Sequence, residues 1–178
     1  MRNTERKSLF MKILYLIDSI SIWSGKIFRW TALILAAVVL CEVIARYLFN
    51  SPTIWAFDSA MFVYSVLYLM GGAYVLWEGK HIRVDVIYMR FSKRTQAALD
   101  LVFYVVFFFP YVSLMTWWGY KATCWSYRAG EISNTSQWGE QVYLWKFLIP
   151  LGFFLMLLQG IPEFIRTIEG FRRDTNGS

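Results

Sequence analysis

Charged residues are scarce in this chain: Asp, Glu, Lys and Arg together make up 17% of its 178 residues. Soluble globular domains carry about 25% charged residues, so this chain has too few polar side chains to cover a surface exposed to water. Hydrophobic residues reach 57%, and the mean hydropathy is +0.42. This composition excludes a soluble enzyme, a disordered chain and a small secreted domain held together by disulfides.

Metal-binding and redox side chains are also few. His81 is the only histidine, which excludes a haem held by two histidines of one chain and disfavours a zinc site. Cys41 and Cys124 form no CxxC pair, and we expect both to be small buried hydrophobic residues. We find no Ser–His–Asp or metal-hydrolase arrangement around this one histidine near the membrane surface. The sequence therefore predicts no catalytic site, no metal and no cofactor.

Long apolar runs are abundant. Four of them approach the ~20 residues that a helix needs to cross ~30 Å of hydrocarbon. We place the spans at about residues 28–49, 58–77, 97–120 and 142–161. A membrane β-barrel would instead show ~10-residue stretches of alternating polarity. Since no repeat or domain boundary interrupts the chain, the sequence predicts an all-α integral membrane protein, with residues 1–178 forming one membrane domain.

Basic residues are distributed unequally between the two sides of these spans. Fourteen of the 18 Lys and Arg residues lie before the first span, between the second and third, or after the fourth. Positive residues mark the cytoplasmic side of a membrane protein, so we expect both termini in the cytoplasm. The net charge of +6 does not indicate nucleic-acid binding, because these residues lie at the membrane edge, where they set topology and contact anionic lipids.

Two cytoplasmic stretches are predicted to be amphipathic helices on the membrane surface. In residues 8–27, apolar side chains recur every three or four positions, as in an interfacial helix. A secretory signal peptide is the competing interpretation. However, Lys12 and Asp18 interrupt the apolar run and no small-residue cleavage site follows, so we expect the segment to be retained. Residues 83–91 form the second, shorter interfacial helix.

Glu42 and Arg46 are charged residues within the first span. At a spacing of four residues they share one helix face and can pair. A charge in the membrane suggests a functional site, and a single Glu in a small four-helix chain is compatible with a proton-coupled exporter. The alternative is a structural pair, with Arg46 bonded to Glu42 or to Asp58. We favour the structural pair, because the other spans offer almost no polar group at mid-membrane.

Prolines and glycines inside the spans predict packing features rather than a transport route. Pro110 and Pro150 lie within the third and fourth spans without neighbouring glycine clusters or polar side chains. We therefore expect kinks that shape packing, and not the broken helices of a substrate site. Gly71 and Gly72 allow the second span to approach another helix closely. This chain alone is predicted to form no transport pathway.

Short motifs lie at and between the ends of the spans, and their order and spacing carry a resemblance. They are the stretch Arg-Tyr-Leu-Phe-Asn-Ser-Pro from Arg46 to Pro52, then Trp55 and Asp58, then Gly72 before His81 and Asp85, and finally Pro150-Leu151-Gly152. This arrangement resembles the small membrane subunit of tripartite ATP-independent periplasmic (TRAP) transporters, from the first span to the end of the fourth. Many members have two adjacent acidic residues where this chain has Asp58-Ser59.

The resemblance implies a function and partners. In that family a periplasmic binding protein captures a substrate, commonly a carboxylate-bearing organic acid, and a large membrane subunit carries it inward with sodium. The small subunit packs on the large one as part of a rigid scaffold and offers an outer surface for the binding protein. We therefore expect a multi-pass protein of the bacterial inner membrane. It would have no substrate or ion site of its own, and sodium would bind the large subunit.

The motif residues are expected to anchor helices rather than bind a ligand. Trp55 near Asp58 would fix the outer hairpin, while His81 and Asp85 would tie the cytoplasmic loop to the second span. The full set of structural or interface candidates is Glu42, Arg46, Pro52, Trp55, Asp58, Gly72, His81, Asp85, Pro150 and Gly152. Two alternatives stay open: a stand-alone proton-coupled exporter that uses Glu42, and a non-haem anchor subunit of another membrane complex.

Overall fold

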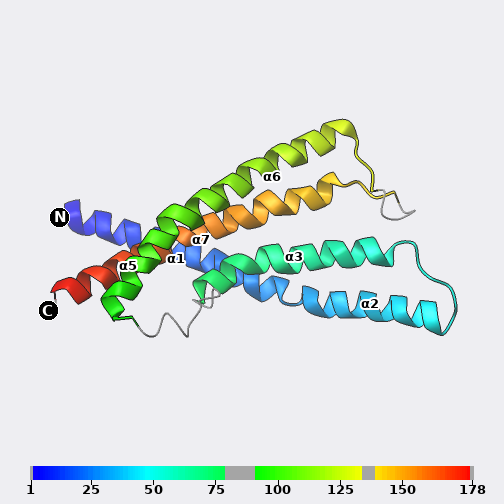
Figure 1. The fold of residues 1–178 in the computed structure, drawn as a ribbon, viewed down its shortest axis with the longest axis horizontal. Coiled ribbons are helices and arrows are strands. Elements are labelled where there is room, and N and C mark those ends of the chain that lie inside the picture. Colours follow the sequence, from blue (N-terminus) through cyan, green and yellow to red (C-terminus); the bar gives the residue numbers. More distant parts are fainter. Residues whose placement is uncertain (1, 79–90, 134–138, 177–178) are drawn as a thin grey trace.

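The computed structural model describes residues 2–78, 91–133 and 139–176. Within these ranges the chain is helical apart from loops and one isolated antiparallel bridge (Figure 1). Four helical segments are long and apolar enough to cross a membrane, which confirms the predicted all-α membrane fold. Both chain ends lie at the same end of the molecule in Figure 1. Their location in the cytoplasm stays a prediction.

Two helices, separated by a short break, account for the N-terminal third of the chain. Helix α1 covers Arg2–Phe28 and α2 covers Thr31–Tyr47. At the break, the amide of Trp30 donates to the carbonyl of Ile27 at 3.2 Å, three residues back. The first span was predicted at 28–49, so α2 begins later and ends earlier than expected. Helix α1 includes the predicted 8–27 segment, and its placement on the membrane surface stays a prediction.

The faces of α1 explain how it packs. Large apolar side chains point outward and are half or more exposed, including Leu16, Ile20 and Trp23. The inward face is small and mostly polar and consists of Leu14, Asp18, Ser21, Ser24 and Gly25. This inward face packs on α3 and α7. The apolar face that the sequence pattern identified is therefore available to lipid. The opposite, mostly polar face of α1 makes its contacts within the protein.

The remaining helices build two adjacent hairpins. Helix α3 covers Ala56–Trp77 and contacts α1, α2 and α7. The third span is composed of α5 (Lys93–Phe103), η1 (Tyr104–Phe108) and α6 (Phe109–Ala129). Helix α7 covers Tyr143–Asn176 and packs along α6 and α3. In Figure 1, α2 lies beside α3 and α6 beside α7. An aromatic and aliphatic core of Leu76, Phe108 and Val112, with Phe153 and Met156 against it, joins the two hairpins.

The connection after the third span is shorter than the sequence suggested. The predicted spans at 97–120 and 142–161 left residues 121–141 as their connection, but α6 continues to Ala129 and ends at Gly130, whose φ of 60° is left-handed. Glycine adopts this conformation without steric cost, so it terminates the helix. At the other end, α7 continues fifteen residues past the predicted boundary at Ile161. Periodicity alone did not show that polar residues continue these helices beyond the apolar runs.

Segment η1 is a π-helical turn directly before Pro110. The amide of Phe109 donates to the carbonyl of Tyr104, five residues back, instead of four as in an α-helix. Proline has no amide hydrogen, and its ring crowds the carbonyl four residues earlier. A π turn widens the backbone at this point and accommodates the ring. The expected packing feature at Pro110 is therefore a bulge in an otherwise continuous helix.

Candidate functional site

The α2–α3 hairpin has its loop at the end of the molecule opposite both termini (Figure 1). This end is predicted to be extracytoplasmic and is called the outer end below. Its loop is organised around the carboxylate of Glu42. One of its oxygens accepts from Arg46, with Nε at 3.1 Å and the terminal nitrogen at 2.7 Å. The other oxygen accepts from the Thr53 amide at 3.1 Å and from the Thr53 hydroxyl. Both carboxylate oxygens are thus occupied. Of the two partners considered for Arg46, the structure pairs it with Glu42.

The other outer motif residues lie on the same hairpin. Pro52 is exposed in the loop, and Trp55 occupies the position before α3, where its carbonyl accepts from the Ser59 amide at 3.0 Å. The Trp55 side chain is 40% exposed, whereas Asp58 in the first turn of α3 is fully buried. An acidic group in a first helical turn interacts favourably with the helix dipole. The predicted anchoring roles of these residues remain predictions.

Gly72, Pro150 and Gly152 lie where helices cross. A Cβ placed on Gly152 would lie 2.7 Å from Cβ of Leu69 and 2.9 Å from its carbonyl oxygen, and one on Gly72 would lie 2.9 Å from the Met156 sulfur. These two glycines bring the backbones of α3 and α7 together. Pro150 is buried in α7, and its ring contacts α6 at Gly119. The three residues therefore position helices. His81 and Asp85, like most of the predicted helix 83–91, fall outside the described residues.

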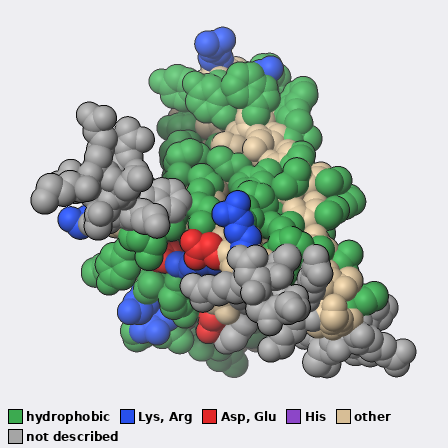
Figure 2. Space-filling view, turned by 90° about the vertical axis from the view of Figure 1, so that its left-hand side faces the viewer, with side chains coloured by type: hydrophobic (Ala, Val, Ile, Leu, Met, Phe, Trp, Pro, Cys, Tyr) green, Lys and Arg blue, Asp and Glu red, His purple; other side chains and the backbone are tan. Residues whose placement is uncertain are grey.

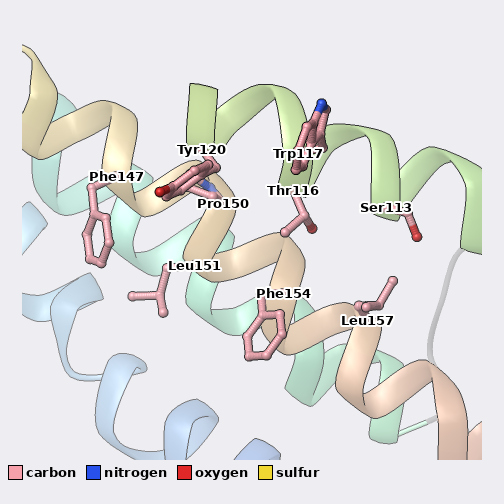
Figure 3. A pocket seen from close by; sticks show the side chains of 9 residues that line it. All are labelled: Ser113, Thr116, Trp117, Tyr120, Phe147, Pro150, Leu151, Phe154 and Leu157. Carbon is pink, nitrogen blue, oxygen red and sulfur yellow. The ribbon is translucent and has the colours of Figure 1, made fainter. Parts of the chain in front are cut away.

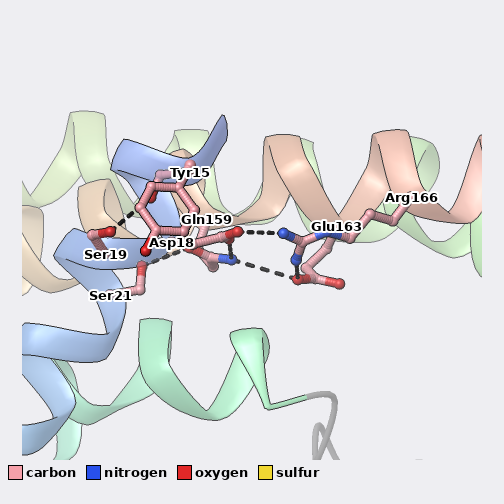
Figure 4. A network of polar contacts seen from close by, with 7 residues as sticks. All are labelled: Tyr15, Asp18, Ser19, Ser21, Gln159, Glu163 and Arg166. Carbon is pink, nitrogen blue, oxygen red and sulfur yellow. Dashed lines mark hydrogen bonds and ion pairs between the residues drawn. The ribbon is translucent and has the colours of Figure 1, made fainter. Parts of the chain in front are cut away.

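A polar network joins α1 to α7 at the end of the molecule that carries both termini (Figure 4). The amide of Gln159 is central and fully buried. Its oxygen accepts from the Ser21 hydroxyl at 2.7 Å, and its nitrogen donates to Asp18 at 2.9 Å and to Glu163 at 3.5 Å. Arg166 donates to Glu163 at 2.5 Å and also to Asp18.

The sequence pattern explains why these side chains meet. Asp18 and Ser21 share one face of α1, while Gln159, Glu163 and Arg166 are spaced by four and three residues and share one face of α7. The network contains two carboxyl groups and one guanidinium, so its formal charge with both acids ionised is −1. Figure 2 views the molecule from this end, where acidic and basic side chains meet among mostly hydrophobic ones.

Sequence reasoning missed this network. Asp18 was noted only as a break in an apolar run, and Arg166 only as one of the basic residues that set topology. The available signal was the matching polar face on each helix, three or four residues apart in both. Because the two faces are about 140 residues apart in the chain, nothing local indicates that they pack together.

The outer end of α6 and α7 carries a second ion pair. Lys146 Nζ lies 2.5 Å from the Glu131 carboxylate. The hydrogen bond from Lys146 lowers the pKa of Glu131 below its ordinary value. Next to it, Ile132 and Gln141 form the isolated bridge, with the Ser133 amide bonded to the Glu140 carbonyl at 2.7 Å. These contacts bring the two ends of the outer loop together on that side of the molecule.

An open groove of about 590 Å³ lies between α6 and α7 (Figure 3). Its walls are aromatic and aliphatic and include Trp117, Phe147 and Leu151. The hydroxyl of Thr116 also lines it, but donates to the Val112 carbonyl of its own helix at 2.8 Å. A carboxylate or an inorganic ion would find no charged partner among the lining residues. Ser113 and Tyr120 are the other hydroxyl-bearing residues of the lining. The groove therefore offers a mainly apolar surface without a charged group.

Among the described residues, no group of three His, Cys, Asp or Glu side chains is arranged to hold a metal ion. The polar clusters instead connect one structural element to another: α2 to its loop, α1 to α7, and the outer loop to α7. The geometry indicates a helical body whose charged groups hold it together.

Comparison with known proteins identifies the family. A family model described as tripartite ATP-independent periplasmic transporters, DctQ component, matches residues 35–170, which is more than half of the chain. The matched region starts within α2 and includes α3, α6 and most of α7, but not α1. No curated protein gives a match. The chain therefore belongs to the DctQ family, which makes it the small membrane subunit of a TRAP transporter, a multi-pass inner-membrane protein and not an enzyme.

Proposed function

We propose that this chain is an accessory scaffold that packs on the large transport subunit of a sodium-coupled TRAP importer. The substrate is an organic acid with a carboxylate, delivered by a periplasmic binding protein that docks on the outer face. The family description names ATP-independent transport, which supports energy supply by an ion gradient. Sodium coupling and the carboxylate substrate are carried over from the family resemblance.

The distribution of polar groups carries the scaffold proposal. The Glu42 and Glu131 clusters lie at one end of the molecule and the Gln159 network near the other. Between them, α3, α6 and α7 contact one another through apolar side chains and glycines in the described residues. A solute pathway needs polar groups at mid-membrane. The chain is built as a rigid body that a moving partner would work against.

Co-purification tests the proposal. The full chain, expressed with its neighbouring reading frames and extracted in mild detergent, is expected to copurify with a much larger multi-span membrane protein in fixed ratio. In liposomes, uptake of an organic acid should need the large subunit, the binding protein, a sodium gradient and this chain. A clean monomer or small homo-oligomer, with full uptake in its absence, would contradict the proposal.

The exporter alternative is disfavoured by the geometry of Glu42. A proton-coupled carboxylate must be free to exchange its proton with a substrate or with water. The Glu42 carboxylate is instead bonded to Arg46 of the same helix and to Thr53 of the outer loop. Transport by the purified chain, measured in liposomes with an imposed proton gradient, distinguishes the exporter from the scaffold subunit. Transport that Glu42→Gln abolishes would favour the exporter, and absence of transport by the unmodified chain excludes it.

A further inference from the structure

A second, smaller groove of about 250 Å³ lies where the break between α1 and α2 faces α3. It is separate from the α6–α7 groove and from the polar clusters described above. Cationic side chains form one wall and the apolar face of α3 forms the other. Its principal lining residues are Lys26, Arg29, Leu67, Gly71, Tyr74 and Val75.

Two glycines create this groove. A Cβ on Gly25 would lie 2.3 Å from the ring of Tyr74, so glycine lets α1 approach α3 at this point. The chain then breaks at Arg29 and Trp30 before α2 begins. Opposite, Gly71 has nothing within 4 Å of the position where its Cβ would be. The contact at Gly25 and the missing side chain at Gly71 leave an open slot along α3.

The charges of the groove are of one sign. Lys26 and Arg29 are both exposed, and neither forms an ion pair with a described residue. The guanidinium of Arg29 lies 5.6 Å from the centre of the Trp30 ring, and cations and tryptophan favour the headgroup level of a bilayer. No acidic side chain is among the described lining residues. An anion placed here would face two positive charges.

The apolar wall extends along α3 from Val75, near the end of that helix, to Leu67, closer to its middle. Leu67 and Val75 are eight residues apart on α3, or about 12 Å at 1.5 Å per residue. Val75 is 39% exposed, so the wall is open to the side. A soluble anion such as phosphate would use the cations but not this wall. A molecule with an anionic head and an apolar tail would use both.

We propose that this groove is a binding site for one anionic phospholipid. The phosphate lies between Lys26 and Arg29, and an acyl chain follows α3 from Val75 past Gly71 to Leu67, toward the middle of the span. Anionic lipids are enriched where basic residues flank a span on the cytoplasmic side, and each Lys or Arg near the surface adds to the attraction. The lipid fills the angle between α1 and α3 and so supports the break at Arg29.

Lipid binding to the full-length protein in mild detergent, with any copurifying partner, tests the site. Native mass spectrometry is expected to show one phosphatidylglycerol bound at least about tenfold more tightly than phosphatidylcholine. Lys26→Gln with Arg29→Gln should weaken phosphatidylglycerol binding by about tenfold. The control variant, Lys12→Gln with Arg172→Gln, removes two exposed cations elsewhere at the same end of the molecule and should change binding less than twofold.

A second pair of variants tests the apolar wall. Gly71→Leu adds a side chain to the groove at a position where a Cβ has nothing within 4 Å. It should abolish binding while circular dichroism and the melting temperature stay unchanged. Gly170→Leu, also in open space on a helix, should leave binding intact. The site is overturned by equal binding of the two lipids, by equal losses in a variant and its control, or by competition from millimolar inorganic phosphate. None of these outcomes depends on whether a transport partner is present.

Discussion

The two ends of the molecule differ in how their acidic side chains are paired. At the outer hairpin, Glu42 bonds to Arg46 and Thr53, which are 4 and 11 residues away in the chain. At the other end, Asp18 bonds to Gln159 and Arg166, 141 and 148 residues away. The first cluster fixes a loop and the second fixes the relative position of two helices.

This difference indicates what each cluster stabilises. The Glu42 cluster forms within one helical hairpin, and Arg46 is more than half exposed. Loss of this cluster is therefore expected to affect the loop first. The Gln159 network is mostly buried, and its bonds to Asp18 and Ser21 form only when α1 is packed on α7. Breaking a buried network leaves its remaining groups without partners, which costs more than an exposed pair contributes.

Replacing Asp18 has the largest expected effect. Asp18→Ala removes a partner from both Gln159 and Arg166 and should lower the free energy of unfolding by about 3 kcal/mol. Denaturant titration in detergent, followed by tryptophan fluorescence, measures the change. Ser19→Ala, next to it on α1 but bonded only within its own helix, should cost much less. Equal effects of the two variants would show that α1 is not held by the network.

The second largest effect is expected when a methyl group is added at Gly152. Gly152→Ala places a Cβ against the backbone of Leu69 and should destabilise the protein by about 2 kcal/mol through overpacking. Gly71→Ala meets open space on α3 and is the matched control. Because α3 and α7 connect the two ends, Gly152→Ala should also weaken contacts at both of them. A melting temperature unchanged in Gly152→Ala would contradict the close crossing.

Loss of the Glu42 charge should act locally. In Glu42→Gln the bonds to Arg46 and Thr53 weaken, so the Thr53 amide should exchange with deuterium faster while the melting temperature changes less than in Asp18→Ala. Hydrogen–deuterium exchange by mass spectrometry reports on residues 48–55. Glu169→Gln, an exposed acid of α7, is the control. A rise in exchange throughout the protein would show that Glu42, like Asp18, stabilises the packing of the whole molecule, and would contradict a local role.

The smallest effect is expected at Glu131. Lys146 lowers the pKa of this carboxyl in the folded protein. Its stabilising contribution is therefore complete above the ordinary glutamate pKa of about 4.3 and is lost as the pH falls through the lower folded value. The melting temperature should decrease on acidification in that range, and less so in Glu131→Gln. An identical pH dependence in both proteins would rule out this contribution.

The helical spans follow from the sequence because a continuous apolar run has one stable form in lipid. For the same reason, the pairing of Glu42 with Arg46 follows from their spacing on one helix. These features are predictable because the surrounding lipid determines the helical structure and the ion pair forms between neighbours on one helix. Close approach to another helix was predicted for both Gly71 and Gly72. It is confirmed at Gly72 and wrong at Gly71, which faces open space.

What the sequence did not reveal depends on how distant helices pack. The apolar face of α1 was visible, but that Asp18 and Ser21 point into the protein is decided by α7. The continuation of α6 to Ala129 depends on Gly130 and on contacts with α7, and not on hydropathy. Tyr104 and Phe108 pack against Phe164 of α7 directly or through neighbouring rings, and no pattern in the third span predicts that partner.

The π turn before Pro110 is geometrically equivalent to one extra residue inserted into a continuous helix. One residue rotates a helical surface by about 100°, so the side of α6 that faces α7 depends on keeping this extra residue. Deleting one residue from Tyr104–Phe108 would realign the whole of the 21-residue α6 and turn Val112 and Gly119 away from their neighbours. The length of this span is therefore as tightly constrained as its composition.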